Sequence, residues 1–447
     1  MKIIIAGAGS GKTTSMASII KETANKRLPG RQYFCIAFTN NAVDHISNKL
    51  RELYKGSIPC YIKVMTIHSF LYQEVIKPYY HLLYGISYER VSLRPLGDNV
   101  MYRAKEVSNL EENGAIHVSV IPQRAMWVFK GKSTDKKIHK DKRKQIVNIF
   151  SIYCGHIFVD EAQDIDKPTR QILEALDAKN IDITLMGDPK QDLHGYGNLR
   201  LLSKKDNVIV EYKNQCYRCP KKHLEISNTL VEGKEIQTSN VDGGFVRIRF
   251  ETDISNMSEY VKSGNFDLAY IMKRNNRFDT HVMKNEREID ELYHLMLELI
   301  PKYFNLSNLE LHRHSFLAAQ YFVDGVKKGK ELSGIVRKIF KINIGKREYA
   351  QIASLVNDFK SDSSNVLVSS IESIKGQEGD NCLFILSKDL ATYLFLDKND
   401  NNKTKAALYV ALTRSRKNLT ILLTEEVEKK YPKTCVEKFF RQLGCAD

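Results

Sequence analysis

MKIIIAGAGSGKTTSMASII, residues 1–20, combines an apolar run, a loop of small residues and a Lys-Thr pair. Ile3–Ile5 suits a buried strand, because β-branched side chains pack well in a sheet that is covered on both faces. The loop Ala6–Gly11 tolerates unusual backbone angles, so its N–H groups can wrap a phosphate. A helix that begins near Thr13 attracts anions to its N-terminus. This order of elements predicts a nucleoside triphosphate site, the alternative being a chance Gly-rich turn.

Two side chains of this P-loop have distinct expected roles. Lys12 should reach the β- and γ-phosphates, and the Thr13 hydroxyl should hold Mg²⁺. The residues expected to bind the nucleotide are Ala6, Gly7, Ala8, Gly9, Ser10, Gly11, Lys12, Thr13 and Thr14.

Polar groups also follow two later apolar runs. Ile157–Val159 leads directly into Asp160 and Glu161, and Gln191 ends the stretch GDPKQ after another buried strand. The carboxyl ends of strands are where an α/β sheet presents its ligand groups. Asp160 can therefore hold Mg²⁺, Glu161 can deprotonate the attacking water, and Gln191 can report on the γ-phosphate. A surface acidic turn is the alternative for Asp160 and Glu161.

Two arginines in the later part of the chain suit phosphoryl transfer. Arg218 lies in CYR, residues 216–218, and Arg414 lies in YVALTRSR, residues 409–416. Arginine neutralises charge on a transferring phosphoryl group, a role worth about 10³–10⁵ in rate where measured. A single arginine is otherwise more often part of a surface ion pair.

The composition limits the classes of protein that fit. The chain has 447 residues, an apolar fraction of 43% and eight scattered cysteines, which favours a globular protein with reduced thiols. No stretch is long and apolar enough to span a bilayer, and the first strand leaves no room for a signal peptide, so we expect a cytoplasmic protein without a membrane partner. The lone CxxC at 216–219 lacks a second pair of ligands for zinc.

The charge is strongly positive. Lys and Arg number 68 against 53 Asp and Glu, a net charge of +15, which favours a polyanionic partner. The run KGKSTDKKIHKDKRK, residues 130–144, carries eight of the basic residues and two Asp. This run is either a solvated loop or a contact to the phosphate backbone of a nucleic acid.

The order of strands and helices predicts an α/β fold. Apolar runs alternate with helical stretches near both ends of the chain, which indicates two parallel sheets, each interrupted by a mainly helical insertion. The expected division is 1–70 with 151–207 (domain 1A, with the P-loop), 71–150 (insertion 1B), 208–275 with 365–447 (domain 2A) and 276–364 (a reduced insertion 2B).

The motifs, taken together, resemble those of the UvrD/Rep/PcrA group of superfamily 1 helicases. They are AGAGSGKT, AFTNNA, TIHSF, VDEAQD, GDPKQ, QCYR, SIKGQE and YVALTRSR, in this order from Ala6 to Arg416. The resemblance implies two RecA-like domains with ATP bound between them, ATP and Mg²⁺ as cofactors, and 3′-to-5′ movement on single-stranded DNA or DNA with a 3′ tail. The chain is also similar to the compact UvrD-like subunit of the Gabija anti-phage system.

The resemblance also implies roles for particular residues. Lys12, Glu161, Gln191, Arg218 and Arg414 would be catalytic, with Thr13 and Asp160 on the metal. Tyr217 would stack on the adenine and Glu378 would touch the ribose. The positions that match the DNA contacts of the family are Phe38, Thr39, Asn40, Thr66, His68 and Tyr196. Phe38 and Tyr196 would stack on bases, which is sequence-tolerant and worth about 1–3 kcal/mol per base.

One departure from the family pattern leads to a prediction about nucleotide choice. The Gln-containing motif that reads adenine precedes the P-loop strand in the family, and here that strand begins at residue 2 or 3. Losing hydrogen bonds to a polar edge relaxes discrimination. We expect GTP to be hydrolysed within about tenfold of ATP, a gap of roughly 1.4 kcal/mol. Comparing kcat/KM for ATP, dATP, GTP and CTP checks this, and an ATP preference above about a thousandfold would show that other groups read the base.

Two functions from different classes remain open at this point. The first is a DNA-dependent ATPase motor, a translocase or helicase that moves on single-stranded DNA. The second is a DNA- or nucleotide-sensing ATPase subunit of a nuclease-containing defence or repair complex, with little unwinding of its own. A 5′-to-3′ motor fits less well, because SIKGQE resembles the 3′-to-5′ group more closely.

Overall fold

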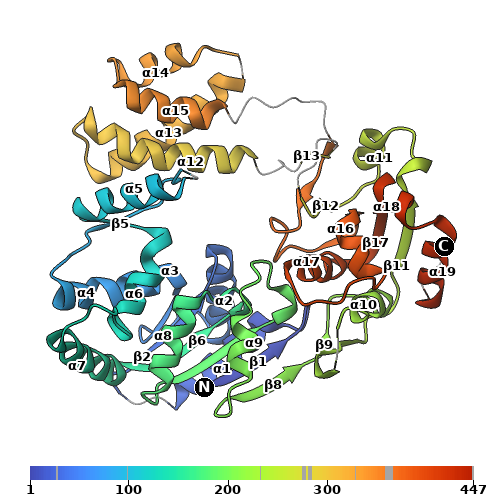
Figure 1. Cartoon of the computed structure of the whole chain (residues 1–447), viewed down its shortest axis with the longest axis horizontal. Helices are drawn as coiled ribbons and strands as arrows, with labels where there is room; N and C mark the ends of the chain where they lie inside the picture. The colour runs from blue at the N-terminus through green and yellow to red at the C-terminus, as the bar shows by residue number, and fades with distance from the viewer. Residues whose placement is uncertain are drawn as a thin grey trace. The chain divides into compact units, whose positions relative to one another are not determined.

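The computed structural model describes residues 1–26, 29–97, 99–231, 233–273, 278–279, 284–327, 329–357 and 366–444. The chain forms two compact units. The first consists of residues 1–88, 119–274 and 369–447, and the second of residues 89–118 and 275–368. The first unit contains both large sheets (Figure 1), so the α/β fold with two parallel sheets is confirmed.

The first sheet has the strand order β3-β2-β6-β7-β1-β8, and every neighbouring pair is parallel. Its strands are β1 (Lys2–Ala6), β2 (Gln32–Ala37), β3 (Ile62–Thr66), β6 (Cys154–Val159), β7 (Asp182–Gly187) and β8 (Ile209–Lys213). The helices that belong with it are α1 (Lys12–Asn25), α2 (Asn40–Leu53), α3 (Ile67–Phe70), α4 (Lys77–Tyr84), α6 (Ile121–Phe129), α7 (Lys137–Tyr153), α8 (Lys167–Asp177) and α9 (Asn198–Ser203).

Helices α1 and α2 cover one part of this sheet. Met16 and Ile20 of α1 share a buried core with Ile46 of α2 and with Phe158 and Met186 of the sheet. These helical residues recur at intervals of about four, the spacing that keeps apolar side chains on one face of a helix. This packing holds the start of α1, and with it the P-loop, against the sheet.

The boundary expected at residue 207 is wrong. Strand β8 pairs in parallel with β1, Lys2 opposite Ile209 and Ala6 opposite Lys213, so it completes the first sheet instead of starting the second. Its sequence IVEYK is mostly exposed or half-buried. An edge strand of this kind lacks the continuous apolar run by which a central strand is recognised.

The second sheet has the strand order β11-β17-β16-β12-β15 and is also parallel. Its strands are β11 (Phe245–Phe250), β12 (Leu268–Ile271), β15 (Ser369–Ser370), β16 (Gly379–Leu386) and β17 (Ser415–Leu423), and a short pair, β9 (Gln215–Cys216) and β10 (Thr238–Ser239), lies outside it. Its helices are α10 (Lys221–Asn228), α11 (Met257–Ser263), α16 (Lys388–Leu394), α17 (Lys403–Leu412), α18 (Glu425–Lys430) and α19 (Lys433–Gln442).

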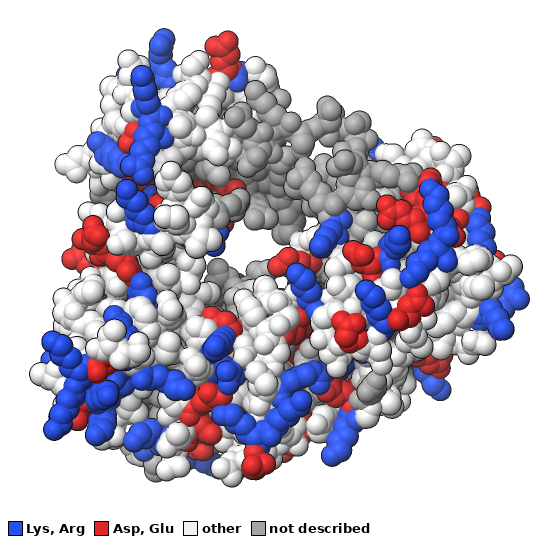
Figure 2. All heavy atoms as spheres, viewed as in Figure 1, with Lys and Arg blue, Asp and Glu red and all other residues white. Residues whose placement is uncertain are grey.

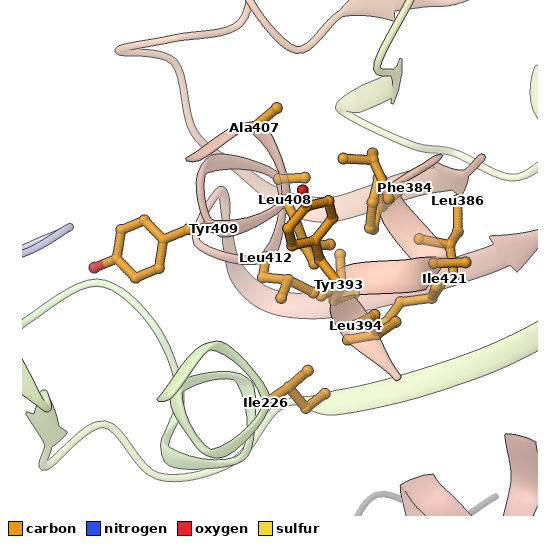
Figure 3. Close-up of a cluster of buried hydrophobic side chains, with 14 of the residues drawn as sticks. Ile226, Phe384, Leu386, Tyr393, Leu394, Ala407, Leu408, Tyr409, Leu412 and Ile421 are labelled. Atoms are coloured by element: carbon orange, nitrogen blue, oxygen red, sulfur yellow. The ribbon is translucent and has the colours of Figure 1, made fainter. Parts of the chain in front are cut away.

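Helix α17 is buried on nearly every side, and its two faces have different neighbours. Leu408 and Leu412 point into the core of the second sheet with Phe384 and Ile421 (Figure 3). The ring of Tyr409 points away from these side chains (Figure 3). Tyr409 is nevertheless only 2% exposed, because it reaches the P-loop. The helix therefore joins the core of one sheet to the nucleotide loop of the other.

The second unit is mainly helical. It contains α5 (Val100–Glu112), α12 (Lys284–Leu299), α13 (Asn308–Lys327), α14 (Leu332–Phe340), α15 (Lys346–Asn357) and the short strands β4 (Arg90–Ser92), β5 (Ala115–His117), β13 (Phe278–Asp279) and β14 (Val366–Leu367). Ser92 donates a hydrogen bond to Glu298 at 2.9 Å, and Arg94 lies 3.5 Å from the same carboxylate. No described helix is long and apolar enough to cross a membrane.

This grouping divides the segment expected to form insertion 1B. Residues 71–88 and 119–150 pack with the first sheet, whereas residues 89–118 belong with the helices of the second unit. The expected boundaries at 275/276 and 364/365 lie outside the described residues. The four-domain division therefore stays a prediction.

Candidate active site

The predicted site residues gather at the carboxyl edge of the first sheet. The P-loop follows β1, Asp160 follows β6, and Gln191 lies just beyond β7. These three strands are neighbours in the order β6-β7-β1. Because all are parallel, their carboxyl ends meet at one edge, where open α/β sheets bind ligands.

The P-loop has the conformation that a phosphate cradle requires. Gly9 and Gly11 have φ of 66° and 70°, a region that favours glycine. The amide of Ser10 donates to the carbonyl of Gly7 at 3.3 Å, and α1 begins at Lys12. Apart from its chain neighbours, no atom of the described residues lies within 4 Å of the position that a Cβ on Gly11 would occupy. The loop thus leaves space beside Gly11 at the N-terminus of α1, where an anion is favoured.

Asp160 and Thr13 form an oxygen-rich corner beside the loop. The Asp160 carboxylate accepts hydrogen bonds from the Thr13 hydroxyl and from the Glu161 amide, the latter at 3.0 Å. Burial and the neighbouring Glu161 raise the pKa of Asp160 to about 7. Mg²⁺ prefers hard oxygen ligands, and a divalent cation would relieve this buried carboxylate, so the two side chains fit the ion that an ATP site uses.

Glu161 is held in a constrained backbone conformation. Its φ of 52° and ψ of 40° lie in the left-handed region, which is uncommon for a residue with a side chain and clusters at functional sites. Burial alone would raise the pKa of Glu161, but the charges of Lys12 and Lys375 outweigh it and hold the pKa below its ordinary value. The carboxylate is therefore ionised and can accept a proton.

A buried network lies behind Glu161. The Gln163 amide donates to Glu161 at 2.5 Å, while its oxygen accepts from the Asp188 amide at 2.9 Å. Asp188 in turn accepts from the Gln191 side chain at 3.0 Å and pairs with Lys190 at 2.8 Å. Gln191 thus has a fixed position in the network that supports the expected base.

Arg218 and Arg414 both come from the second sheet, and their surroundings differ. Arg218 forms an ion pair with Glu378, so the residue expected at the ribose is held by an arginine in this structure. Arg414 is 1% exposed, and its guanidinium donates to the carbonyls of Val410 at 3.0 Å and Gln377 at 3.3 Å. Burial and the charge of Arg218 lower the pKa of Arg414.

No ion pair to Arg414 occurs within the described parts of the chain. A buried guanidinium without a counter-ion costs several kcal/mol in typical proteins. The charge of Arg414 is one of those that lower the pKa of Glu161, so Arg414 lies near the expected base. This placement is what an arginine that meets an anionic ligand requires.

Three further residues join the two sheets, and the sequence patterns had not assigned them a role. Lys375 pairs with both oxygens of Asp164 at 2.6 Å. Gln237 donates to the carbonyl of Ala8 at 2.9 Å and accepts from the hydroxyl of Tyr409 at 2.5 Å. Lys375 and Tyr409 lie inside the motifs SIKGQE and YVALTRSR, so their place near the site could have been predicted from the sequence. Gln237 lies in no motif.

Tyr217 is available for the stacking role. Its side chain is 71% exposed, while its amide donates to the carbonyl of Gly9 at 2.8 Å. The backbone of this residue is therefore anchored on the P-loop and its ring is free to contact a base. Its predicted contact to adenine stays a prediction.

Five of the six residues predicted to contact DNA lie at the carboxyl ends of β2 and β3, on the other side of β6 from the P-loop, and the sixth, Tyr196, follows β7. Thr39 and Thr66 each accept a backbone amide at 3.2 Å as helix caps, from Ala42 and Ser69 respectively. Tyr196 is 45% exposed and stacks on His194 with the ring centroids 5.0 Å apart. His194 is a second exposed ring that the motifs did not single out. Of the remaining predicted positions, Asn40 is exposed, and Phe38 and His68 are half-buried.

Comparisons with known proteins agree with this arrangement. A family model described as an AAA domain matches residues 1–196. The Gabija protein GajB of Bacillus cereus is 28% identical over 203 residues, which are 43% of this chain and 37% of GajB. The ATP-dependent DNA helicase srs2 of Schizosaccharomyces pombe is 22% identical over 51% of this chain and 32% of its own length. A probable DNA helicase II homolog of Mycoplasma genitalium is 21% identical over 52% of this chain and 40% of its own length.

The aligned region thus spans about a third to two fifths of each relative. Over these regions the chain is similar to UvrD/Rep-like helicases of superfamily 1.

Proposed function

We propose that this protein is an ATP-driven motor that moves 3′ to 5′ on single-stranded DNA. The observation that carries the proposal is the placement of Arg414, which is buried without an ion pair within the described residues and lies near Glu161 of the other sheet. A nucleotide whose cleavage uses groups from both sheets couples hydrolysis to their relative movement.

The chemistry divides among a few side chains. Lys12 and the P-loop amides bind the β- and γ-phosphates, and Thr13 and Asp160 hold Mg²⁺, which when bound neutralises phosphate oxygens. Glu161 takes the proton from the attacking water. Arg414 and Arg218 stabilise the charge on the transferring group, and Arg218 must first leave Glu378 to do so.

Gln191 and Lys375 provide a route from hydrolysis to movement. Gln191 is hydrogen-bonded to Asp188 in the network behind Glu161, and Lys375 links Asp164 to the second sheet. When the γ-phosphate is lost, the partners of Gln191 change and the two sheets separate. The exposed rings at Tyr196 and His194 lie on the same loop as Gln191, so this change reaches the expected DNA contacts.

Direction of movement tests the proposal. The substrate is an oligonucleotide with biotin and streptavidin at either the 5′ or the 3′ end. With ATP, we expect the protein to displace streptavidin from the 5′ end much faster than from the 3′ end, and the Lys12→Ala variant to displace neither. Faster displacement from the 3′ end would contradict the proposed polarity.

The basic run offers a second test, of nucleic-acid binding. Lys136, Lys137 and Lys140 lie at or in the first turn of α7 and are exposed. Figure 2 shows Lys and Arg side chains gathered at the part of the molecule where Figure 1 places α7. Each lysine that meets a phosphate contributes about 1 to the slope of log K against log salt. On single-stranded DNA the contribution is about 0.7 per phosphate contact, so replacing the three by Gln should lower the slope by about 2 and weaken binding.

A matched control for this variant changes the same charge elsewhere. Lys26 directly after α1, Lys49 of α2 and Lys429 of α18 each pair with a glutamate of the adjoining helix. Replacing these three by Gln should leave the slope nearly unchanged. Equal slopes for the two triple variants would show that the run at 130–144 is a solvated surface.

The match to GajB favours a second candidate role. In that role the protein is a DNA- or nucleotide-sensing ATPase subunit of a nuclease-containing complex in defence or repair. A duplex with a 3′ tail separates the two functions. The motor predicts strand separation with ATP, whereas the sensing subunit predicts DNA-stimulated hydrolysis without strand separation when the protein is alone.

A further inference from the structure

Two cysteines bracket the residues that are expected to contact the nucleotide from the second sheet. Cys216 and Cys219 flank Tyr217 and Arg218 in the sequence CYRC. Both side chains are fully buried, and with Leu224 of α10 they form a small cluster. Neither the P-loop mechanism nor the DNA contacts use a thiol, so this pair is not explained by the proposed function.

The two thiols are close and oriented towards each other. The Cys219 side chain lies within hydrogen-bonding reach of the Cys216 sulfur, and the Cys219 amide donates to that sulfur at 3.3 Å. These hydrogen bonds, with those of neighbouring amides, lower the pKa of Cys216 to about 6. The pKa of Cys219 is raised correspondingly. The first cysteine therefore has thiolate character, which is the reactive form.

Both sulfurs also contact the nucleotide machinery. A Cβ on Gly9 would lie 2.8 Å from the Cys216 sulfur, so this thiol packs directly on the P-loop. The Cys219 sulfur lies 3.6 Å from the carbonyl of Thr413, the residue before Arg414. A change of bonding at these sulfurs acts on the P-loop and on both arginines.

Metal binding does not account for the pair. Within the described residues, no group of three or more His, Cys, Asp or Glu side chains is arranged to hold a metal ion. His223 follows at a spacing that zinc sites use, but it bonds to the carbonyl of Phe245 at 3.2 Å instead. Redox chemistry of the dithiol remains, and it needs the two sulfurs and an oxidant that accepts two electrons.

We propose that Cys216 and Cys219 form a reversible disulfide on reaction with a hydroperoxide, and that this modification inhibits ATP hydrolysis. The inhibition rests on the proposed function, whereas the disulfide itself does not. The oxidant reaches Cys216 when the second sheet moves away from Gly9, since the P-loop covers this sulfur in the structure.

The reaction balances in two steps. The Cys216 thiolate attacks one oxygen of the peroxide, an S–O bond forms, the O–O bond breaks, and the departing oxygen takes a proton to leave as water or an alcohol. The Cys219 sulfur then attacks the sulfenic acid, its proton is released, the S–S bond forms and the S–O bond breaks with loss of water. The two sulfurs together lose two electrons, which reduce the peroxide.

The disulfide would inhibit catalysis because Arg218 lies between the two cysteines, inside the loop of residues 216–219 that the S–S bond closes. Arg218 is paired with Glu378 and has to rotate away from it to reach a phosphate. A disulfide between residues 216 and 219 restrains the backbone on both sides of Arg218 and removes the Cys219 contact to Thr413. When an arginine cannot reach the transferring phosphoryl group, kcat falls by about 10³–10⁵-fold where this has been measured.

The experiment uses the full chain with Cys60, Cys435 and Cys445 replaced by Ser, which removes two exposed thiols and the one near the C-terminus. The protein is treated with hydrogen peroxide and then with dithiothreitol. Peptide mass and ATP turnover are measured at each stage, beside Cys219→Ser and, in case that variant misfolds, Cys219→Ala. We expect the peptide with residues 216–219 to lose two hydrogen atoms in mass. Turnover should fall by about a hundredfold or more, and both should recover on reduction.

Three results would overturn the proposal. The first is an unchanged mass at a peroxide dose that oxidises Cys60 and Cys435 in the unmodified chain. The second is equal, reversible inhibition in the Cys219 variants, which cannot form this disulfide. The third is a formed disulfide with unchanged turnover, which overturns the inhibition. If the reduced protein hydrolyses no ATP, the proposed function fails and the mass change still tests the disulfide.

Discussion

Replacing Glu161 by Gln should reduce ATP turnover by about 10²–10⁴-fold and leave nucleotide binding nearly unchanged. Glutamine keeps the shape of the side chain and its hydrogen-bonding reach but cannot accept the proton of the attacking water. The wild-type carboxylate is ionised, because the charges of Lys12 and Lys375 outweigh its burial and keep its pKa low. Steady-state kcat and the affinity for a fluorescent ATP analogue measure the two effects separately.

The control for this variant is Glu211→Gln. Glu211 lies on the edge strand β8, is 49% exposed and pairs with Lys2, so its loss should leave turnover close to wild type. Turnover of the Glu161 variant within a few-fold of wild type would contradict the assignment of the base. A large loss of nucleotide affinity with unchanged kcat would instead make Glu161 a binding residue.

Replacing Arg414 by Ala should lower kcat by about 10³–10⁵-fold. The side chain comes from the second sheet, is buried and has no ion pair within the described part of the chain. These are the properties of a cation reserved for the charge that develops on the phosphoryl group. Arg414→Lys keeps the charge but not the planar fork, so it should recover only part of the activity.

A fold defect would also lower activity, so thermal unfolding has to be measured for each Arg414 variant. Removing the Arg414 side chain leaves a buried cavity and takes the donors away from the carbonyls of Val410 and Gln377, so a loss of stability has to be separated from the loss of kcat. Arg416→Ala is the control, since Arg416 is 49% exposed and pairs with Asp380. Equal effects at the two positions, or unchanged turnover in Arg414→Ala, would remove Arg414 from catalysis.

The parts of the site that are local in sequence could be predicted, because each is a strand followed at once by its polar groups. The P-loop after β1 and the carboxylates after β6 are of this kind. In a parallel sheet such groups must meet at one edge, whatever the strand order. The parallel α/β class follows from the same alternation of strands and helices.

Contacts between distant segments could not be predicted. Gln237 reaches Ala8 and Tyr409, two residues more than 170 positions away from it in each direction, and no local pattern encodes such a meeting. The pairing of Arg218 with Glu378 depends likewise on how the second sheet folds. Side-chain hydrogen bonds of this range are settled by tertiary packing, on which a short motif carries no information.

The domain boundary expected at residue 207 was wrong for a related reason. Strand β8 is short, polar and exposed, so its place in the sheet comes from backbone pairing with β1 and not from a buried apolar run. Residues 89–118 belong with the second unit through contacts such as Ser92 to Glu298, which are polar and far apart in sequence. Composition changes mark neither of these boundaries.

Hydrolysis of ATP by the purified chain, measured with and without single-stranded DNA, tests the central claim most directly. We expect the purified protein to hydrolyse ATP slowly without DNA and its kcat to rise clearly at saturating single-stranded DNA. The Lys12→Ala variant should hydrolyse no ATP in either condition. Hydrolysis that no DNA stimulates, or hydrolysis that persists in Lys12→Ala, would contradict a motor whose two sheets share the nucleotide.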